Sequence, residues 1–392
     1  MIFPKKIEPY TTLKLLEAGI QFGFNILILQ ILSSEIVSQT ILIVNTIGVI
    51  YQIIDFSQGN IILSKNFDID IKNFIFKKRG GLLFLSILMY GIIAYILNFS
   101  PFIVMYTIYI IILTGHKTFS YFFLNQSHRF NTSYYIGYIL LTIINIALIL
   151  YSTAYRNEVS IFIFLFLNGI ILLLPFLLLS RIIFTRKFLS LEKIIHVQRQ
   201  IITLSIPNWI NQISYVIKVF CMAYFIDRHI PNQGKEFKLI LMGGTIIATL
   251  AYSFLHQFYS QNKSTEYFRI SFKLLLKALI PACIIIIAIG LYTNIPLTVY
   301  SLIVVLLQML LTGIYLILTT YYTLSFNKKE INTISSLNGI LIVGITSYFL
   351  FKPDISNSAY NIISIFAAIE ILLLILCFPK LFFSFWGPVR KQ

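Results

Sequence analysis

Long apolar runs separated by short polar segments dominate the pattern along the chain. A helix needs about 20 mostly apolar residues to cross the hydrocarbon layer of a membrane. The runs reach this length, and they lack the two-residue alternation that marks the strands of a membrane barrel. The pattern therefore predicts an all-α integral membrane protein with about twelve transmembrane helices. The predicted spans cover residues 10–32, 36–63, 80–97, 101–123, 133–152, 159–180, 202–226, 237–257, 274–291, 296–318, 331–350 and 359–378.

A basic segment, residues 181–200, separates the sixth predicted span from the seventh. It divides the chain into an N-terminal six-helix bundle, residues 1–180, and a C-terminal six-helix bundle, residues 201–392. Sequence repetition between the halves is faint. Two bundles around a central cavity are nevertheless the usual plan of transporters whose site lies between repeats. We therefore expect 181–200 to be a cytoplasmic connecting loop.

Composition supports a membrane environment and excludes a soluble domain. Hydrophobic residues make up 58% of the chain, charged residues only 11%, and the mean hydropathy is +0.86. Soluble domains carry roughly 25% charged residues. A net charge of +16 is also found in proteins that bind nucleic acids, but here the basic residues form short clusters between apolar runs. We therefore attribute the positive charge to loops that fix the orientation of the protein in the membrane, and we predict no nucleic-acid partner.

The distribution of Lys and Arg predicts the orientation, because cytoplasmic loops retain positive charge. If the N-terminus lies on the cytoplasmic side of the membrane, few of the basic residues fall in loops on the outer side. A few more lie within the predicted spans. All the others lie on the inner side, so both termini are predicted to be cytoplasmic. The outer residues are Arg156, Arg228, Lys235, Lys238 and Lys352, and those within spans are Lys14, Lys117, Lys218 and Lys277.

The loops and motifs argue against an enzyme. The longest predicted outer loop covers only residues 227–236, which is too short for the catalytic loops of lipid-linked sugar polymerases. The sequence contains no Gly-rich loop before Lys-Ser or Lys-Thr, and no His-Glu-x-x-His run. The three cysteines stand alone within apolar segments, as buried structural cysteines do. We therefore predict no catalytic residue, no metal site and no cofactor.

Ionisable residues inside the predicted spans are the candidates for function. Each costs about 2.5 to 3.5 kcal/mol near the bilayer centre, so it should face the protein interior. Lys14, Glu17, Asp55 and Lys117 lie at one depth, near the cytoplasmic edge, which predicts a polar network. This network either closes the inner end of the cavity by ion pairing or contacts the substrate or a coupling ion.

Lys218 lies deeper, about 24 Å from the inner end of its span at 1.5 Å per residue. No acidic residue lies within one helical turn of it. It therefore needs an anion, which is either a carboxylate from another helix or a phosphate of the substrate. Glu370 is the ionisable residue of the last predicted span. Polar residues expected to line the cavity are Gln52, Asn211 and Gln212.

Three short stretches together resemble one family. Asp55, Phe56 and Ser57 resemble an Asp-Phe-Gly element, with serine in place of the glycine and Lys65 near the usual arginine. An aromatic run leading into Gln126 and Arg129 is similar to a second pattern of the same family, in which an aromatic residue, a glutamine, a charged residue and another aromatic residue follow one another. The third stretch opens the second half of the chain with Pro207, Trp209, Asn211 and Gln212. The chain thus resembles the Wzx polysaccharide flippases of the multidrug, oligosaccharidyl-lipid and polysaccharide exporter superfamily.

This resemblance implies a bacterial inner-membrane transporter with a cationic cavity that opens alternately to the two sides. The implied substrate is an undecaprenyl-diphosphate-linked oligosaccharide unit of O-antigen or capsular polysaccharide, flipped from the cytoplasmic to the outer leaflet. A polysaccharide polymerase and a chain-length regulator are the implied partners, beside the lipid bilayer. It also implies that Lys218 and Lys117 contact the diphosphate and that Asp55 is a gate or coupling residue. Together with the other ionisable residues of the spans, the expected substrate-binding cations are Lys218, Lys117 and Lys14, and the expected gate or coupling residues are Glu17, Asp55 and Glu370.

Two other functions remain open from the sequence. One is an ion-coupled small-molecule or multidrug exporter of the same superfamily, which would use Glu17 or Asp55 as its coupling site. The other belongs to a different class, a membrane-embedded polysaccharide polymerase, which the short outer loops disfavour.

Overall fold

The computed structural model describes residues 22–55, 101–124, 191–261, 267–325 and 359–377 continuously, together with residue 19 and isolated residues or short runs within 81–92, 140–173 and 333–347. In this part of the chain the regular elements are helices, and no strand occurs. The all-α prediction is therefore confirmed for the described residues. Long apolar segments favour helices in a membrane because a helix satisfies its backbone hydrogen bonds internally.

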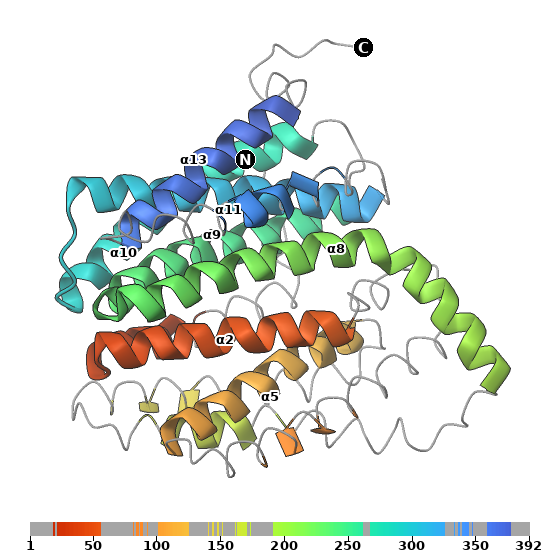
Figure 1. The fold of residues 1–392 in the computed structure, drawn as a ribbon, viewed down its shortest axis with the longest axis horizontal. Coiled ribbons are helices and arrows are strands. Elements are labelled where there is room, and N and C mark those ends of the chain that lie inside the picture. Colours follow the sequence, from red (N-terminus) through yellow and green to blue (C-terminus); the bar gives the residue numbers. More distant parts are fainter. Residues whose placement is uncertain are drawn as a thin grey trace. The chain divides into compact units, whose positions relative to one another are not determined.

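Each of the long helices contains the greater part of one predicted span (Figure 1). The agreement is closest for α5, which begins where the span at 101–123 begins, and for α13, which begins where the span at 359–378 begins. The elements are α2 Ser34–Asp55, α5 Pro101–Leu124, α8 Leu191–His229, η1 Pro231–Gln233, α9 Gly234–Gln261, α10 Tyr267–Tyr292, α11 Val299–Ser325 and α13 Ala359–Cys377.

The helix α8 begins earlier than predicted. It starts at Leu191, so the second half of the predicted connecting loop 181–200 is helical, and its 39 residues extend for about 58 Å. No Gly or Pro occurs from Leu191 to Ile206, so nothing in this stretch breaks the helix. The helix continues through Pro207, a residue type that kinks helices, and its ribbon is bent in Figure 1.

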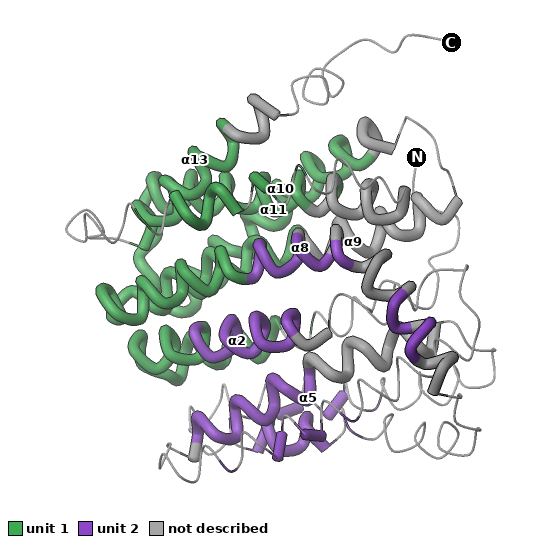
Figure 2. The backbone as a smooth tube through the Cα atoms, turned by 45° about the vertical axis from the view of Figure 1, so that its right-hand side comes forward, with its two compact units in different colours: residues 1–41, 217–392 green, residues 42–216 purple. Residues whose placement is uncertain are grey.

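The chain separates into two compact units, coloured in Figure 2. Unit 1 consists of Met1–Ile41 and Ile217–Gln392, and unit 2 of Leu42–Val216. The boundaries fall inside α2 and α8, and so differ from the predicted boundary between residues 180 and 201. The arrangement of about twelve spans as two six-helix bundles stays a prediction.

Within unit 1, α9 packs against α10 and α11, and α11 packs in turn against α13. Glycines allow the close approach of α9 to α11. A side chain at Gly243 would bring its Cβ within 2.8 Å of Met309 Cε, and one at Gly244 would bring it within 3.2 Å of Thr312 Oγ1. Small residues at such contacts are typical of helix pairs in membranes, where close van der Waals packing drives association.

Apolar side chains also cover the outside of unit 1. On α10, Ile280, Ile284 and Leu291 form one exposed stripe with exposed fractions of 67%, 61% and 72%. Among the described helices, the segments Ser34–Ile53 and Ser271–Tyr292 are long and apolar enough to cross a membrane. An exposed apolar surface of this kind indicates an interaction site for lipid or protein. The structure thus points to membrane association, while the number of spans and the location of the termini stay predictions.

Candidate functional site

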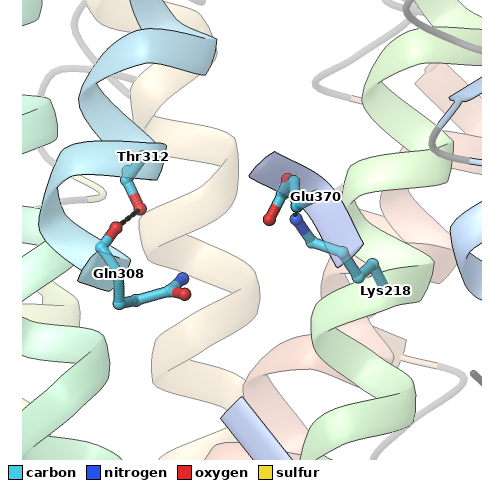
Figure 3. A network of polar contacts seen from close by, with 4 residues as sticks. All are labelled: Lys218, Gln308, Thr312 and Glu370. Carbon is cyan, nitrogen blue, oxygen red and sulfur yellow. Dashed lines mark hydrogen bonds and ion pairs between the residues drawn. The ribbon is translucent and has the colours of Figure 1, made fainter. Parts of the chain in front are cut away.

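Two charged residues from distant parts of the chain meet inside unit 1. The Nζ atom of Lys218, on α8, lies 2.6 Å from Oε1 of Glu370, on α13 (Figure 3). The two residues are only 3% and 2% exposed. The sequence left two anions open as the partner of Lys218, a carboxylate from another helix or a phosphate of the substrate. In the structure, the partner of Lys218 is the carboxylate of Glu370.

The local sequence explains why this pair is buried. Glu370 is the only charged residue of α13, and Lys218 is the only one between Arg199 and Asp227 on α8. Neighbouring residues on α13, including Phe366 and Ala367, are buried in the core. An apolar core strengthens the attraction between the two charges, but removing them from water costs several kcal/mol per ion. Each charge is therefore tolerated because the other is present.

A third helix contributes an aromatic ring to the same point. The Nζ atom of Lys218 lies 5.3 Å from the centroid of the Tyr315 ring, on α11. A ring face within about 6 Å attracts an ammonium group through its quadrupole. The ammonium of Lys218 is thus held by a carboxylate from α13 and a ring from α11. Tyr315 was not predicted from the sequence, because nothing in its spacing separates it from the other aromatic residues.

Polar groups continue along α11 from this point. Gln308 is seven residues before Tyr315 and is therefore on the same face of the helix. It is 9% exposed, and its side chain extends from α11 toward the side on which the ion pair lies (Figure 3). The hydroxyl of Thr312 donates a hydrogen bond of 2.8 Å to the backbone carbonyl oxygen of Gln308, one turn earlier on the same helix. The side-chain amide of Gln308 is a neutral polar group on the face of α11 that also carries Tyr315.

In unit 2, the structure joins two residues that the sequence placed in separate spans. The indole Nε1 of Trp209, on α8, donates a hydrogen bond of 2.7 Å to the backbone oxygen of Gln52, on α2. Gln52 Oε1 is buried and accepts no hydrogen bond from the described residues. Gln212 is half-buried. Of the three residues predicted to line the cavity, the structure describes the side chains of Gln52 and Gln212. The side chain of Asn211 lies outside the described part.

Several predicted site residues lie outside the described residues, in whole or in part. Lys14 and Glu17 are not described. Lys117 belongs to α5 and Asp55 ends α2, but the side chains of both lie outside the described part. The predicted network near the cytoplasmic edge therefore stays a prediction.

A second polar cluster joins the ends of helices in unit 1. The side-chain oxygen of Gln233, in η1, accepts a hydrogen bond of 2.6 Å from the backbone N–H of Ala359, which begins α13. The charge of Glu236, in the first turn of α9, acts on Tyr360 of α13. Burial raises the pKa of the Glu236 carboxyl, although its own backbone N–H and Lys235 partly oppose this rise. This cluster was not predicted from the sequence, because its members come from two segments more than a hundred residues apart.

Metal ligands do not gather in the described helices. In this part of the chain, no group of three or more His, Cys, Asp or Glu residues is positioned to hold a metal ion. Cys221 and Cys283 are half-buried, and neither forms a disulfide bond with another described residue. The ion pair and its aromatic neighbour are thus the main chemical feature of the described core.

Comparisons with protein-family models, with curated proteins and with solved structures find no match for this chain. The function of the protein is therefore inferred from the geometry of the site and from the sequence resemblance.

Proposed function

We propose that the protein is a flippase that moves undecaprenyl-diphosphate-linked oligosaccharide units from the cytoplasmic to the outer leaflet, for O-antigen or capsular polysaccharide synthesis. A cationic cavity would open alternately to the two sides. The observation that carries this proposal is the buried pair of Lys218 and Glu370 between apolar helices.

Stability alone does not account for such a pair. Apolar residues of similar volume often replace a buried ion pair with no loss of stability, and sometimes with a gain of 1–4 kcal/mol. Ionisable residues within membrane helices are rare, and they mark the pathways of ions and charged substrates. The cost of burying Lys218 and Glu370 therefore supports a role in transport.

The chemistry of the pair suits an anionic head group. A diphosphate carries at least two negative charges and could replace Glu370 as the counter-ion of Lys218. Because an unpaired charge in this core is costly, Lys218 would exchange one anion for the other and would not stay unpaired. In the proposed cycle, Glu370 holds Lys218 when no substrate is bound, and the diphosphate displaces Glu370 when substrate enters. The Gln308 amide offers hydrogen bonds of the kind that sugars accept.

The test is to complement a host from which this gene has been deleted. The variants are Lys218→Ala, Lys218→Arg and the exchange Lys218→Glu with Glu370→Lys, with surface polysaccharide and the membrane level of each protein as readouts. We expect Lys218→Ala to lose polysaccharide export and Lys218→Arg to keep a part of it. The exchange variant should accumulate in the membrane, because the pair is restored, but export little, because the cation has moved to another helix. Full export by Lys218→Ala at normal protein levels would overturn the proposal.

One observation favours a second candidate function, an ion-coupled exporter of small molecules. Glu370 is a buried carboxylate whose cation partner could be released by binding H⁺ or Na⁺. This function predicts dye efflux driven by a proton or sodium gradient in everted vesicles, and loss of that efflux in Glu370→Gln. Normal dye efflux in Lys218→Ala, together with unchanged polysaccharide export, would favour it over the flippase.

A further inference from the structure

One face of α10, in unit 1, changes from basic to apolar along its length. Lys273 and Lys277 lie in the second and third turns of this helix, four residues apart, and both are exposed. Exposed positions then continue at helical spacing through Ile280, Ile284 and Leu291. The two lysines and the apolar stripe therefore share one continuous exposed face.

The opposite face of α10 makes the contacts within unit 1. Leu275, Ala282 and Ile286 are buried, and α10 packs against α9 and α11. A side chain at Gly313 of α11 would overlap Leu275 Cδ1. A ligand can therefore reach the face that carries the lysines without displacing any of these contacts.

The two lysines have no acidic partner in the described part of the chain. The helix α10 contains no Asp or Glu, and neither Lys273 nor Lys277 forms an ion pair with a described residue. Like charges four residues apart on a helix repel each other. An external anion bound at this end of the face would offset that repulsion.

The length of the face suits a membrane. Leu291 lies fourteen residues after Lys277, which is about 21 Å at 1.5 Å per residue. The segment Ser271–Tyr292 is one of those long and apolar enough to cross the hydrocarbon layer. Lysines near the end of such a segment extend their ammonium groups to the head-group region while their methylene groups stay on apolar surface. The count of basic residues predicts that this end lies on the cytoplasmic side.

We propose that this face binds an anionic phospholipid, with the phosphate between Lys273 and Lys277 and the acyl chains along Ile280 and Ile284. Two ammonium groups complement the charge of the phosphate, and the apolar side chains that follow complement the chains. A second copy of the protein fits this face less well. Two copies in the same orientation would bring four lysines to one depth in the membrane, where their charges repel. The proposal requires only that α10 cross a membrane, so it does not depend on the proposed function.

The test measures lipid binding by the purified full-length protein, by native mass spectrometry in a mild detergent. The probes are phosphatidylglycerol, phosphatidylcholine with the same chains, and glycerol phosphate, which lacks acyl chains. The variant Lys273→Gln with Lys277→Gln is compared with the wild type and with Lys273→Arg with Lys277→Arg, which keeps both charges. A further control, Arg228→Gln with Lys235→Gln, removes two cations that are predicted to lie on the outer side.

We expect the glutamine variant to bind phosphatidylglycerol at least tenfold more weakly than the wild type, because each lysine near a membrane surface contributes about fivefold. The arginine variant and the outer control should bind it normally, and the other two probes should bind weakly to all four proteins. Without lipid, the glutamine variant should unfold at the same temperature as the wild type, since both changed side chains are exposed.

Three results would overturn the site. The first is equal binding of phosphatidylglycerol by the wild type and the glutamine variant, or an equal loss in the outer control. The second is binding of glycerol phosphate as tight as that of the lipid, which would indicate a site for free phosphate. The third is the loss of a dimer, instead of a bound lipid, in the glutamine variant, which would assign the face to a second copy.

Discussion

Lys218 and Glu370 are 152 residues apart in the sequence, yet their side chains form an ion pair with an N–O distance of 2.6 Å in the apolar core. The pair connects α8 to α13, and Tyr315 brings α11 to the same point. A buried charge that loses its partner strongly destabilises the fold, so separating Lys218 from Glu370 within this core would cost several kcal/mol.

The first prediction concerns the stability of this pair. Glu370→Leu leaves the Lys218 ammonium buried and should lower the free energy of unfolding by about 3–5 kcal/mol. Replacing both residues by Leu removes the buried charges together and should recover most of this loss. Unfolding followed by circular dichroism in detergent measures both variants. Equal stability of the Glu370→Leu protein and the wild type would show that water reaches the lysine.

The second prediction separates the ring of Tyr315 from its hydroxyl. Tyr315→Phe keeps the ring face next to Lys218, whereas Tyr315→Leu removes it. We expect Tyr315→Leu to weaken the interaction free energy between this side chain and the Lys218 ammonium by about 0.5–2 kcal/mol, and Tyr315→Phe to change it less. A double-mutant cycle with Lys218→Leu isolates this interaction from the loss of packing. If Leu costs the same with and without the lysine, the ring serves only to fill space.

The positions of helices were largely predictable from the sequence, because an apolar run long enough to cross a membrane is also a strong helix signal. Pro101 and Ala359 begin helices where the predicted spans begin. The start of α8 was not predictable in this way. Hydropathy marks where the apolar part of a helix begins, whereas the helix itself extends through the polar residues to Leu191.

The site was predictable in part. The depth of Lys218 in its span and the absence of a nearby acid on α8 indicated that it needs an anion. The identity of that anion depends on which helices are neighbours in space, and one sequence does not contain that information. The same reason explains why the polar cluster of Gln233, Glu236 and Tyr360 was missed, since its members meet only when α9 packs near α13.

The third prediction tests the close contact at the start of α9. A Cβ atom at Gly234 would overlap the backbone oxygen of Ser34 and approach Ser38, on α2. Backbone atoms cannot move aside cheaply, so Gly234→Ala should lower the free energy of unfolding by about 1–3 kcal/mol. The matched control is Gly344→Ala, where no neighbouring atom of the described residues would lie within 4 Å of the added Cβ, outside the backbone of its own helix, and alanine should be neutral or slightly stabilising. Thermal unfolding of both variants measures the difference, and equal effects would contradict the contact.

The fourth prediction concerns the pH dependence that Glu236 imposes. Burial raises the pKa of its carboxyl above the usual value of 4.5, so the folded protein holds this proton more strongly than the unfolded chain does. The folded state is therefore favoured most below pH 4.5, and this contribution is lost as the pH rises through the folded pKa. Glu236→Gln cannot lose a proton, so its unfolding temperature should rise relative to that of the wild type as the pH increases from 4.5. Glu35→Gln, at an exposed carboxylate in the first turn of α2, controls for the loss of one charge. A difference between Glu236→Gln and the wild type that stays constant with pH would show that this carboxyl is not buried.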